Sequence, residues 1–260
     1  ADRKLVRAYG LRPELLAMSN AWRSRADGND CLIAAKGSPE AIAALCHLSV
    51  DRFVSIKVSV DAMAAEGLRV LGVAQAGCVA HELPERQTGF DFEFMGLVGL
   101  ADPLRSEVPE AVSDCRSAGI RVIMITGDYP ATARAIARQA GLDFNEVVTG
   151  EKFKALDDAA LSARVKTATV FARIMPEQKL AIVKALKASG EIVAMTGDGV
   201  NDAPSLKAAN IGVAMGGRGT DVAREASSIV LLDDDFGSIV KAIRLGRRIY
   251  DNLRKAMGFI

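Results

Sequence analysis

The chain has 260 residues, half of them apolar and a quarter charged, enough for one large domain or two modest ones with proper hydrophobic cores. Its 33 lysines and arginines nearly balance its 32 aspartates and glutamates. No global field therefore favours nucleic acid or an anionic membrane, and we expect no nucleic-acid partner.

The four cysteines are scattered along the chain without the spacing of a metal site or a disulfide framework. We expect reduced, mostly buried thiols. The start lacks the features of a signal peptide, and no apolar run reaches the roughly 18 residues that a membrane-spanning helix needs. By itself the chain is expected to be soluble.

The first hundred residues alternate short apolar runs with turns and helical segments. Ser38 and Pro39 are typical of a helix N-cap followed by the first helical residue. We expect helices at 39–47 and 51–66, and strands at 15–22, 31–35, 68–76 and 92–100, the first two joined by a polar turn at 23–30.

Lys36 ends one of these strands, and read alone it is an ordinary surface lysine. Gly37 beside it would let a ligand approach the backbone. His47 and His81 lack any partner at metal-ligand spacing, so we interpret both as structural or solvent-facing.

The segment Asp102-Pro103-Leu104-Arg105 interrupts the periodicity, because a proline between two structured blocks favours a hinge over a core. We place a domain boundary there. The predicted division is 1–100, 101–243 and a terminal helix at 244–260.

The second half alternates strands and helices, the pattern of a parallel sheet with helices on both faces. Asp235 is predicted to cap a final basic amphipathic helix. Strands are expected at 120–125, 169–172, 192–195, 211–215 and 229–232, and the other helices at 107–118, 131–140 and 176–189.

The buried strand expected at 192–195 is followed by Thr-Gly-Asp-Gly-Val-Asn-Asp-Ala-Pro at 196–204. Asp202 is predicted to be a helix N-cap, with Pro204 in the first turn. Asp198, Asn201 and Asp202 would crowd at a strand tip, where open α/β sheets place their ligands. Two carboxylates on so tight a loop repel unless a cation is near, and hard oxygen ligands suit Mg²⁺. The alternative is a turn that only caps a helix.

A second Thr-Gly-Asp, residues 126–128, follows the strand expected at 120–125, so the two tips would converge on one polar crevice. There Thr126 and the Gly127 amide can donate hydrogen bonds to a phosphoryl oxygen. Lys179, in the first turn of its helix, could stabilise phosphoryl transfer, although read alone it is an exposed helix residue.

Residues 196–204 resemble the TGDGVNDAP signature of the P-type ATPases, cation pumps that form a phospho-aspartate intermediate. Residues 36–40 resemble the family's KGAPE segment, with Ser38 in place of Ala, and 102–105 resemble DPPR, with Leu104 in place of the second Pro. The resemblance implies an α/β fold: a haloacid-dehalogenase-like, doubly wound parallel sheet with part of an α+β nucleotide-binding domain.

The resemblance also implies roles for individual residues, with ATP as substrate and Mg²⁺ as cofactor. The catalytic residues would be Thr126, Gly127, Asp128, Lys179 and Asn201, and the metal ligands Asp198 and Asp202. The nucleotide would be held by Leu11, Lys36, Gly37, Arg69, Asp102, Arg105 and Arg173. Leu11 stands where the family commonly stacks an aromatic ring on adenine, so adenine affinity is expected to be weak.

Two features invite other interpretations. Thr149-Gly150-Glu151 matches the family's dephosphorylation loop in letters, but that loop belongs to a separate actuator domain, so we predict a plain turn. The basic helix at 244–260 has the character of a membrane-surface or nucleic-acid element. By resemblance it is the stalk that continues into a membrane span.

The family's nucleophilic Asp-Lys-Thr-Gly-Thr is absent from these 260 residues. The resemblance implies that the chain begins inside the nucleotide-binding insertion, and that actuator domain, nucleophile segment and membrane helices are its missing partners. The nucleophile's strand would lie between those ending at Thr126 and Thr196. Without it, two inner strands keep unpaired backbone groups that can pair with another chain. We therefore expect the chain to self-associate or to be poorly stable. We also expect it to lack ATPase turnover.

The leading hypothesis is the cytoplasmic part of a cation pump, at the cytoplasmic face of a membrane, coupling ATP hydrolysis to transport. The 36–40 segment and residues 220–226 favour calcium, sodium or proton pumps over heavy-metal pumps. Two alternatives stay open. One is a non-catalytic nucleotide-binding or assembly module, or half of a split protein, and the other is a soluble phosphatase.

Overall fold

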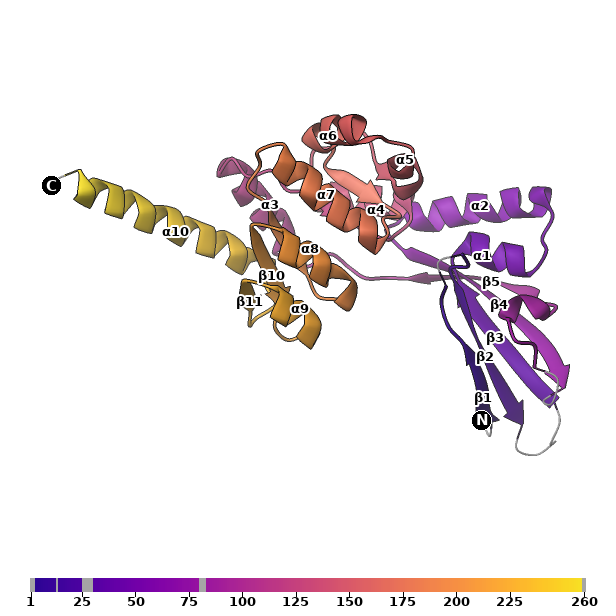
Figure 1. Cartoon of the computed structure of the whole chain (residues 1–260). Coiled ribbons are helices and arrows are strands. Elements are labelled where there is room, and N and C mark those ends of the chain that lie inside the picture. Colours follow the sequence, from indigo (N-terminus) through magenta and orange to yellow (C-terminus); the bar gives the residue numbers. More distant parts are fainter. Residues whose placement is uncertain (1–2, 13, 25–29, 80–82, 259–260) are drawn as a thin grey trace. The chain divides into compact units, whose positions relative to one another are not determined.

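The computed structural model describes residues 3–12, 14–24, 30–79 and 83–258 (Figure 1). It divides into two compact units, Ala1–Asp102 and Pro103–Ile260. The division falls inside the segment 102–105, where the sequence predicts a hinge. The interpretations of His81 and of most of the turn at 23–30 lie outside the described residues.

The first unit is built on a five-stranded antiparallel sheet in the order β1-β2-β3-β4-β5. The strands are β1 (Arg3–Tyr9), β2 (Ala17–Ser24), β3 (Asp30–Gly37), β4 (Arg69–Val79) and β5 (Glu93–Leu100). Two helices, α1 (Pro39–Leu45) and α2 (Val50–Ala65), and a 3-10 turn, η1 (Gln87–Gly89), complete it. As predicted, Ser38 caps α1, its Oγ accepting from the Ala41 amide at 3.2 Å.

One face of this sheet holds the core of the unit. Tyr9, Ser19, Ala35 and Ala74 are paired in succession across β1 to β4, so their side chains share that face. Ile42 of α1 packs there against Gly72, where a Cβ would come within 2.9 Å of the Ile42 Cβ. Lys36, one residue on from Ala35, therefore lies on the opposite face.

The second unit contains two parallel three-stranded sheets. One has the order β6-β8-β7, with β6 (Met124–Ile125), β8 (Val170–Ala172) and β7 (Val148–Thr149). The other has the order β11-β10-β9, with β9 (Ala194–Gly197), β10 (Ile211–Met215) and β11 (Ile229–Leu231). The predicted α/β class with parallel strands is confirmed, and β6 and β9 are each an edge strand of their own sheet.

Helices surround these sheets (Figure 1). They are α3 (Val108–Ser117), α4 (Pro130–Gln139), α5 (Gly150–Lys154), α6 (Asp158–Thr167), α7 (Pro176–Ala188), α8 (Ala203–Ala208), α9 (Asp221–Ala226) and α10 (Phe236–Met257), with a 3-10 turn, η2 (Val200–Asp202). Phe171, Val165 and Ile182 are fully buried in one core cluster of this unit. Burial raises the pKa of the thiol of Cys115, on the buried face of α3, as expected for an inert structural cysteine. No described helix is both long and apolar enough to cross a membrane.

Several predicted element details are wrong. The strand expected at 120–125 is reduced to Met124–Ile125, because only these residues pair with β8. Ile192, expected in a fully buried strand, is 78% exposed, and β9 starts two residues later. Asp202 precedes α8 but does not cap it with its side chain, because its backbone is already helical.

The cap predicted at Asp235 is confirmed, since its Oδ1 accepts from the Gly237 amide at 2.7 Å. The plain turn predicted at Thr149-Gly150-Glu151 is wrong. Thr149 ends β7 and caps α5, its Oγ1 accepting from the Lys152 amide at 3.3 Å.

Candidate functional site

The loop after β6 is closed on itself by the side chain of Thr126. Its Oγ1 donates to Asp128 Oδ2 at 2.9 Å and accepts from the Asp128 amide at 3.0 Å. Gly127, between them, is exposed, and a Cβ there would meet nothing nearer than the Ile174 carbonyl at 4.0 Å. The loop is therefore held in shape while its middle residue stays exposed.

This loop is tied to the loop that follows β8. The Arg173 amide donates to the Asp128 carbonyl at 3.1 Å, and the Ile174 amide donates to the Thr126 carbonyl at 3.1 Å. Arg173 has φ +55°, in the left-handed region that non-glycine residues rarely occupy. Its guanidinium lies 5.4 Å from the Tyr129 ring centroid, within range of a cation–π contact.

The same stretch of chain reaches the second Thr-Gly-Asp loop. Lys179, early in α7, donates from Nζ to Asp202 Oδ1 at 2.7 Å. Residues 173–179, which we call the bridging segment, thus contact the Thr126 loop at one end and the Asp202 loop at the other. The bridging segment thus links the loop of Thr126 and Asp128 to Lys179 and Asp202. The single crevice that the sequence predicts for both loops stays a prediction.

Asp202 is engaged on both of its oxygens. Its Oδ2 accepts from the Gly199 amide at 3.3 Å, and the residue is only 7% exposed. Gly197 is required beside it, because a Cβ there would lie 2.6 Å from the Asp202 Cβ. The Lys179 ammonium compensates the negative charge of Asp202.

Asp198 and Asn201, by contrast, are exposed on the same loop. The Asp198 carbonyl accepts from the Thr220 amide at 2.8 Å, which anchors the backbone and leaves the carboxylate at the surface. Of the two predicted metal ligands, Asp198 is the one open to an ion. Among the described residues, no group of three or more His, Cys, Asp and Glu side chains could hold a metal.

Buried Gln178 holds the bridging segment against the start of α5, and no local sequence pattern indicates this contact. Gln178 donates from Nε2 to the Gly150 carbonyl at 2.7 Å, while its Oε1 accepts from the Met175 amide at 2.9 Å. A Cβ on Gly150 would collide with the Arg173 carbonyl. The Thr149-Gly150-Glu151 triplet therefore fits tightly against the segment that carries Lys179.

The predicted nucleotide residues of the first unit gather at one end of its sheet. Lys36 and Arg69 are both exposed and share the face opposite the core, about 14 Å apart by strand geometry. Leu11 is exposed at the end of β1, near the turn into β2. Packing also restricts Gly37, because a Cβ there would lie 2.5 Å from the Leu16 carbonyl oxygen at the start of β2. Its predicted nucleotide contact stays a prediction.

The remaining predicted nucleotide residues are divided between the units. Asp102 is exposed at the end of the first unit. Arg105 belongs to the second, where its Nη1 donates to the Asp234 carbonyl in the turn before α10. Asp234 also accepts from the Gly217 and Arg218 amides, both at 2.9 Å, so Arg105 fastens a loop of its own unit.

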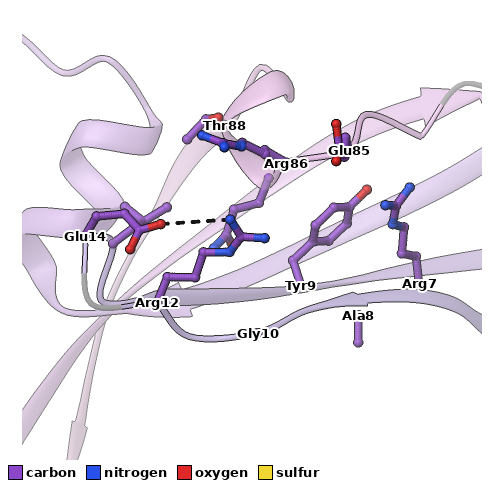
Figure 2. A pocket seen from close by; sticks show the side chains of 11 residues that line it. Arg7, Ala8, Tyr9, Gly10, Arg12, Glu14, Glu85, Arg86 and Thr88 are labelled. Carbon is purple, nitrogen blue, oxygen red and sulfur yellow. Dashed lines mark ion pairs between the residues drawn. The ribbon is translucent and has the colours of Figure 1, made fainter.

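A pocket of about 220 Å³ lies on the first unit, between the end of β1 and residues 85–88 (Figure 2). Several of its polar side chains already have partners within the protein. Tyr9 donates to the Pro84 carbonyl at 2.7 Å, Arg7 to the Leu83 carbonyl at 3.3 Å, and Arg12 pairs with Glu14 at 3.9 Å. None of the predicted site residues lines it, and we assign it no ligand.

Comparison with known proteins finds haloacid dehalogenase-like hydrolase models and cation-transporting ATPases that resemble the chain. A family model described as haloacid dehalogenase-like hydrolase matches residues 64–210, and a second with that description matches 178–243. "Calcium-transporting ATPase 1" of Bacillus cereus is 48% identical over 76% of this chain and 23% of its own length.

Two further relatives align with nearly the whole chain. "Calcium-transporting ATPase" of Bacillus subtilis is 43% identical over 100% of this chain and 28% of its own length. "Sodium/potassium exporting P-type ATPase cta3" of Schizosaccharomyces pombe is 42% identical over 96% of this chain and 26% of its own length. The chain spans about a quarter of the length of these relatives.

Proposed function

The chain belongs to the haloacid dehalogenase-like hydrolase family, and from that premise we propose that it is the nucleotide- and phosphate-handling part of a P-type cation-transporting ATPase. In the whole pump it would bind ATP and Mg²⁺ at the cytoplasmic face of the membrane. There it would couple ATP hydrolysis to ion movement through an aspartyl-phosphate. The first unit would be the nucleotide domain and the second the phosphorylation domain.

The observation that carries the proposal is the pair of Thr-Gly-Asp loops joined by the bridging segment. Exposed Gly127 offers a backbone N–H donor, the Thr126 hydroxyl would offer a second once released from Asp128, and Lys179 supplies a positive charge nearby. A phosphoryl group in transfer spreads negative charge over three oxygens, and fixed donors with a cation stabilise that charge. Asn201, exposed on the second loop, would add a further donor.

The residues also fit a magnesium ion of the kind that keeps most of its coordination for water and phosphate. Such ions take only one or two carboxylates from the protein. Asp198 is exposed and suited to be that carboxylate, whereas Asp202 is held by Lys179 and would position the lysine and the loop. Bound there, the ion would offset the charge of the phosphate oxygens.

Nucleotide binding is proposed for the open face and end of the first unit's sheet. Lys36 and Arg69 offer two cations to phosphate oxygens, and exposed Leu11 offers an apolar contact without a ring to stack on. ATP titration should show affinity that falls in Lys36→Ala and Arg69→Ala but not in Lys57→Ala. Lys57 is an exposed lysine of α2, so it is a matched charge control.

The phosphoryl-transfer role is tested by supplying the missing nucleophile. The chain is mixed with a second polypeptide that carries the Asp-Lys-Thr-Gly-Thr strand, and acid-stable, hydroxylamine-sensitive label is measured after addition of ATP labelled at the γ-phosphate. We expect label on the second polypeptide only with Mg²⁺ and the chain present. It should be lost in Asp198→Asn and Lys179→Met and kept in Glu191→Gln, an exposed carboxylate outside the site.

Label of equal strength in Asp198→Asn and Glu191→Gln would contradict the assigned site. Phosphate release by the chain alone would contradict the proposal in a different way, because a nucleophile inside these 260 residues would then be needed. A chain that binds ATP but never supports labelling would favour the non-catalytic nucleotide module.

A further inference from the structure

The loop between β10 and α9, residues 216–220, lies beside the loop that carries Asp198. The two loops follow neighbouring parallel strands, since Gly197 of β9 is paired with Ala214 of β10. The Thr220 amide donates to the Asp198 carbonyl at 2.8 Å, whereas the Asp198 carboxylate is exposed. The direction of that carboxylate therefore depends on where the backbone of the 216–220 loop lies.

Asp234 holds the 216–220 loop by its backbone donors. Its Oδ1 accepts from the Gly217 amide and its Oδ2 from the Arg218 amide, both at 2.9 Å. Hydrogen bonds from successive amides to an ionised carboxylate are stronger than those between neutral groups. A Cβ on Gly217 would lie 2.9 Å from Asp234 Oδ2, closer than ordinary van der Waals contact. The Asp234 carboxylate thus lies directly against the loop.

The carbonyl groups of the same loop are held by Arg224. Its Nη1 donates to the Gly216 carbonyl at 2.8 Å and also to the Gly219 carbonyl. Arg224 belongs to α9, the helix that follows the loop directly, whereas Asp234 lies in the turn after β11. Asp234 therefore ties the loop to a part of the unit beyond the loop's own helix.

Asp234 is itself held in an uncommon backbone conformation. Its φ is +53°, in the left-handed region, which aspartate and asparagine enter more readily than most non-glycine residues. Arg105 donates from Nη1 to the Asp234 carbonyl, and the Asp234 amide donates to the Leu231 carbonyl at 3.4 Å. With its backbone fixed and both carboxylate oxygens engaged, Asp234 is suited to orienting the loop rather than to contacting a ligand.

We propose that Asp234 is a positioning residue for the candidate magnesium site and acts on Asp198 through the 216–220 loop. This role rests on the proposed function, because it concerns the ion that Asp198 would hold. Groups that orient a metal ligand without touching the metal commonly contribute about 10- to 100-fold to metal affinity. Loss of the Asp234 carboxylate should therefore weaken ion binding although Asp198 is still present.

The first test measures ion binding directly. Mn²⁺, which accepts the same oxygen ligands as Mg²⁺, is titrated into the whole chain, and free Mn²⁺ is read from its electron paramagnetic resonance signal. Asp234→Asn tolerates the left-handed backbone but turns one acceptor into a donor that faces an amide N–H. We expect its Mn²⁺ affinity to fall by about tenfold.

Asp233→Asn is the matched control in the same turn. Asp233 accepts from the Asp235 amide at 3.1 Å and from Ser238 Oγ at 2.8 Å, both at the start of α10 rather than in the 216–220 loop. Its Mn²⁺ affinity should equal that of wild type. Equal affinities of Asp234→Asn and Asp233→Asn would overturn the proposal.

Two further readouts separate positioning from a general structural role. In an Asp198→Asn background, Asp234→Asn should cause no further loss of Mn²⁺ affinity, because the carboxylate that it orients is gone. In the labelling assay, Asp234→Asn should raise the Mg²⁺ concentration that gives half-maximal label. At saturating Mg²⁺ the half-maximal ATP concentration should stay unchanged. Equal losses in both backgrounds, or parallel shifts for Mg²⁺ and ATP, would contradict the role.

Amide hydrogen exchange tests the same contacts without any ion. Asp234→Gly keeps a left-handed backbone and removes both acceptors, so it is the second variant. In Asp234→Gly and Asp234→Asn, the Thr220 amide should exchange about fivefold faster than in wild type, and in Asp233→Asn it should not. Unchanged exchange at Thr220 would overturn the proposal. A wild-type chain that binds no Mn²⁺ would instead contradict the proposed magnesium site, so the two failures are distinguishable.

Discussion

At the scale of single residues, the pair Lys179–Asp202 combines structural and chemical roles. Asp202 is almost fully buried, so its carboxylate depends on Lys179 for charge compensation. We predict that Lys179→Met lowers the free energy of unfolding by about 3 kcal/mol, because an unpaired charge would remain buried. Lys179→Met/Asp202→Asn should recover part of the loss. Urea denaturation of wild type, Lys179→Met, Asp202→Asn and the double variant measures this, and additive single effects would contradict the coupling.

Ser205 is the opposite case, a polar group without a partner. Its Oγ is fully buried in α8 and has no hydrogen bond among the described residues. We predict that Ser205→Ala raises the free energy of unfolding by about 1 kcal/mol, because the desolvated hydroxyl is removed.

Ser19→Ala is the matched control for that prediction. Ser19 is equally buried, but its Oγ donates to Gln87 Oε1 at 2.9 Å, so this variant should destabilise its unit by about 1–2 kcal/mol. The free energy of unfolding of each unit, measured from its own denaturation curve, compares the two variants. A loss of stability in Ser205→Ala would mean that the hydroxyl has a partner after all.

At the scale of elements, the bridging segment owes its position to the start of α5. Gly150 admits no side chain because of the Arg173 carbonyl, and Gln178 bonds the Gly150 carbonyl. We predict that Gly150→Ala costs about 2–3 kcal/mol, since the added methyl must displace backbone. Gly246→Ala, in the open middle of α10, should stabilise by up to about 1 kcal/mol. Thermal melts of both variants measure the contrast, and equal effects would show that the collision is relieved without strain.

Elements with strong local signals were predictable, and those fixed by distant contacts were not. The strand at 211–215 matches β10 at both ends, because a buried apolar run between turn residues is a local property. β1 went unpredicted since its charged, mostly exposed sequence shows no alternation, and pairing with β2 decides its conformation. Thr149-Gly150-Glu151 was misread because its partners, Arg173 and Gln178, lie more than twenty residues away.

For the candidate site, too, local residue patterns were predictable and contacts between distant residues were not. The residue types at 126–128 and 196–202 indicated phosphate and magnesium chemistry from sequence alone. The pairing of Lys179 with Asp202 was not visible there, because the two residues are 23 apart and meet only through the packing of α7 against the loop. Sequence therefore predicted the chemistry that we propose for these loops, and the structure separates exposed Asp198 from engaged Asp202.

At the scale of the whole molecule, β6 and β9 are the edge strands of two separate sheets. The resemblance implies a further strand that would lie between these two edges. Their sheets end there in the described residues, so backbone donors and acceptors on these edges face no partner strand. Such edges recruit other chains. We predict concentration-dependent self-association of the 260-residue chain, measurable by sedimentation velocity, and its reduction when a peptide carrying the Asp-Lys-Thr-Gly-Thr strand is added.

A charged side chain placed beside one edge strand distinguishes association through that edge from nonspecific association. Ile192→Lys adds a cation at an exposed position just before β9, and it should shift the chain toward monomer. Ile229→Lys adds the same charge on β11, the far edge of the same sheet, and should leave association unchanged. Because both isoleucines are exposed, neither change should disturb the core. Equal dissociation in the two variants would assign the association to the whole sheet, and a concentration-independent monomer would exclude open edges at β6 and β9.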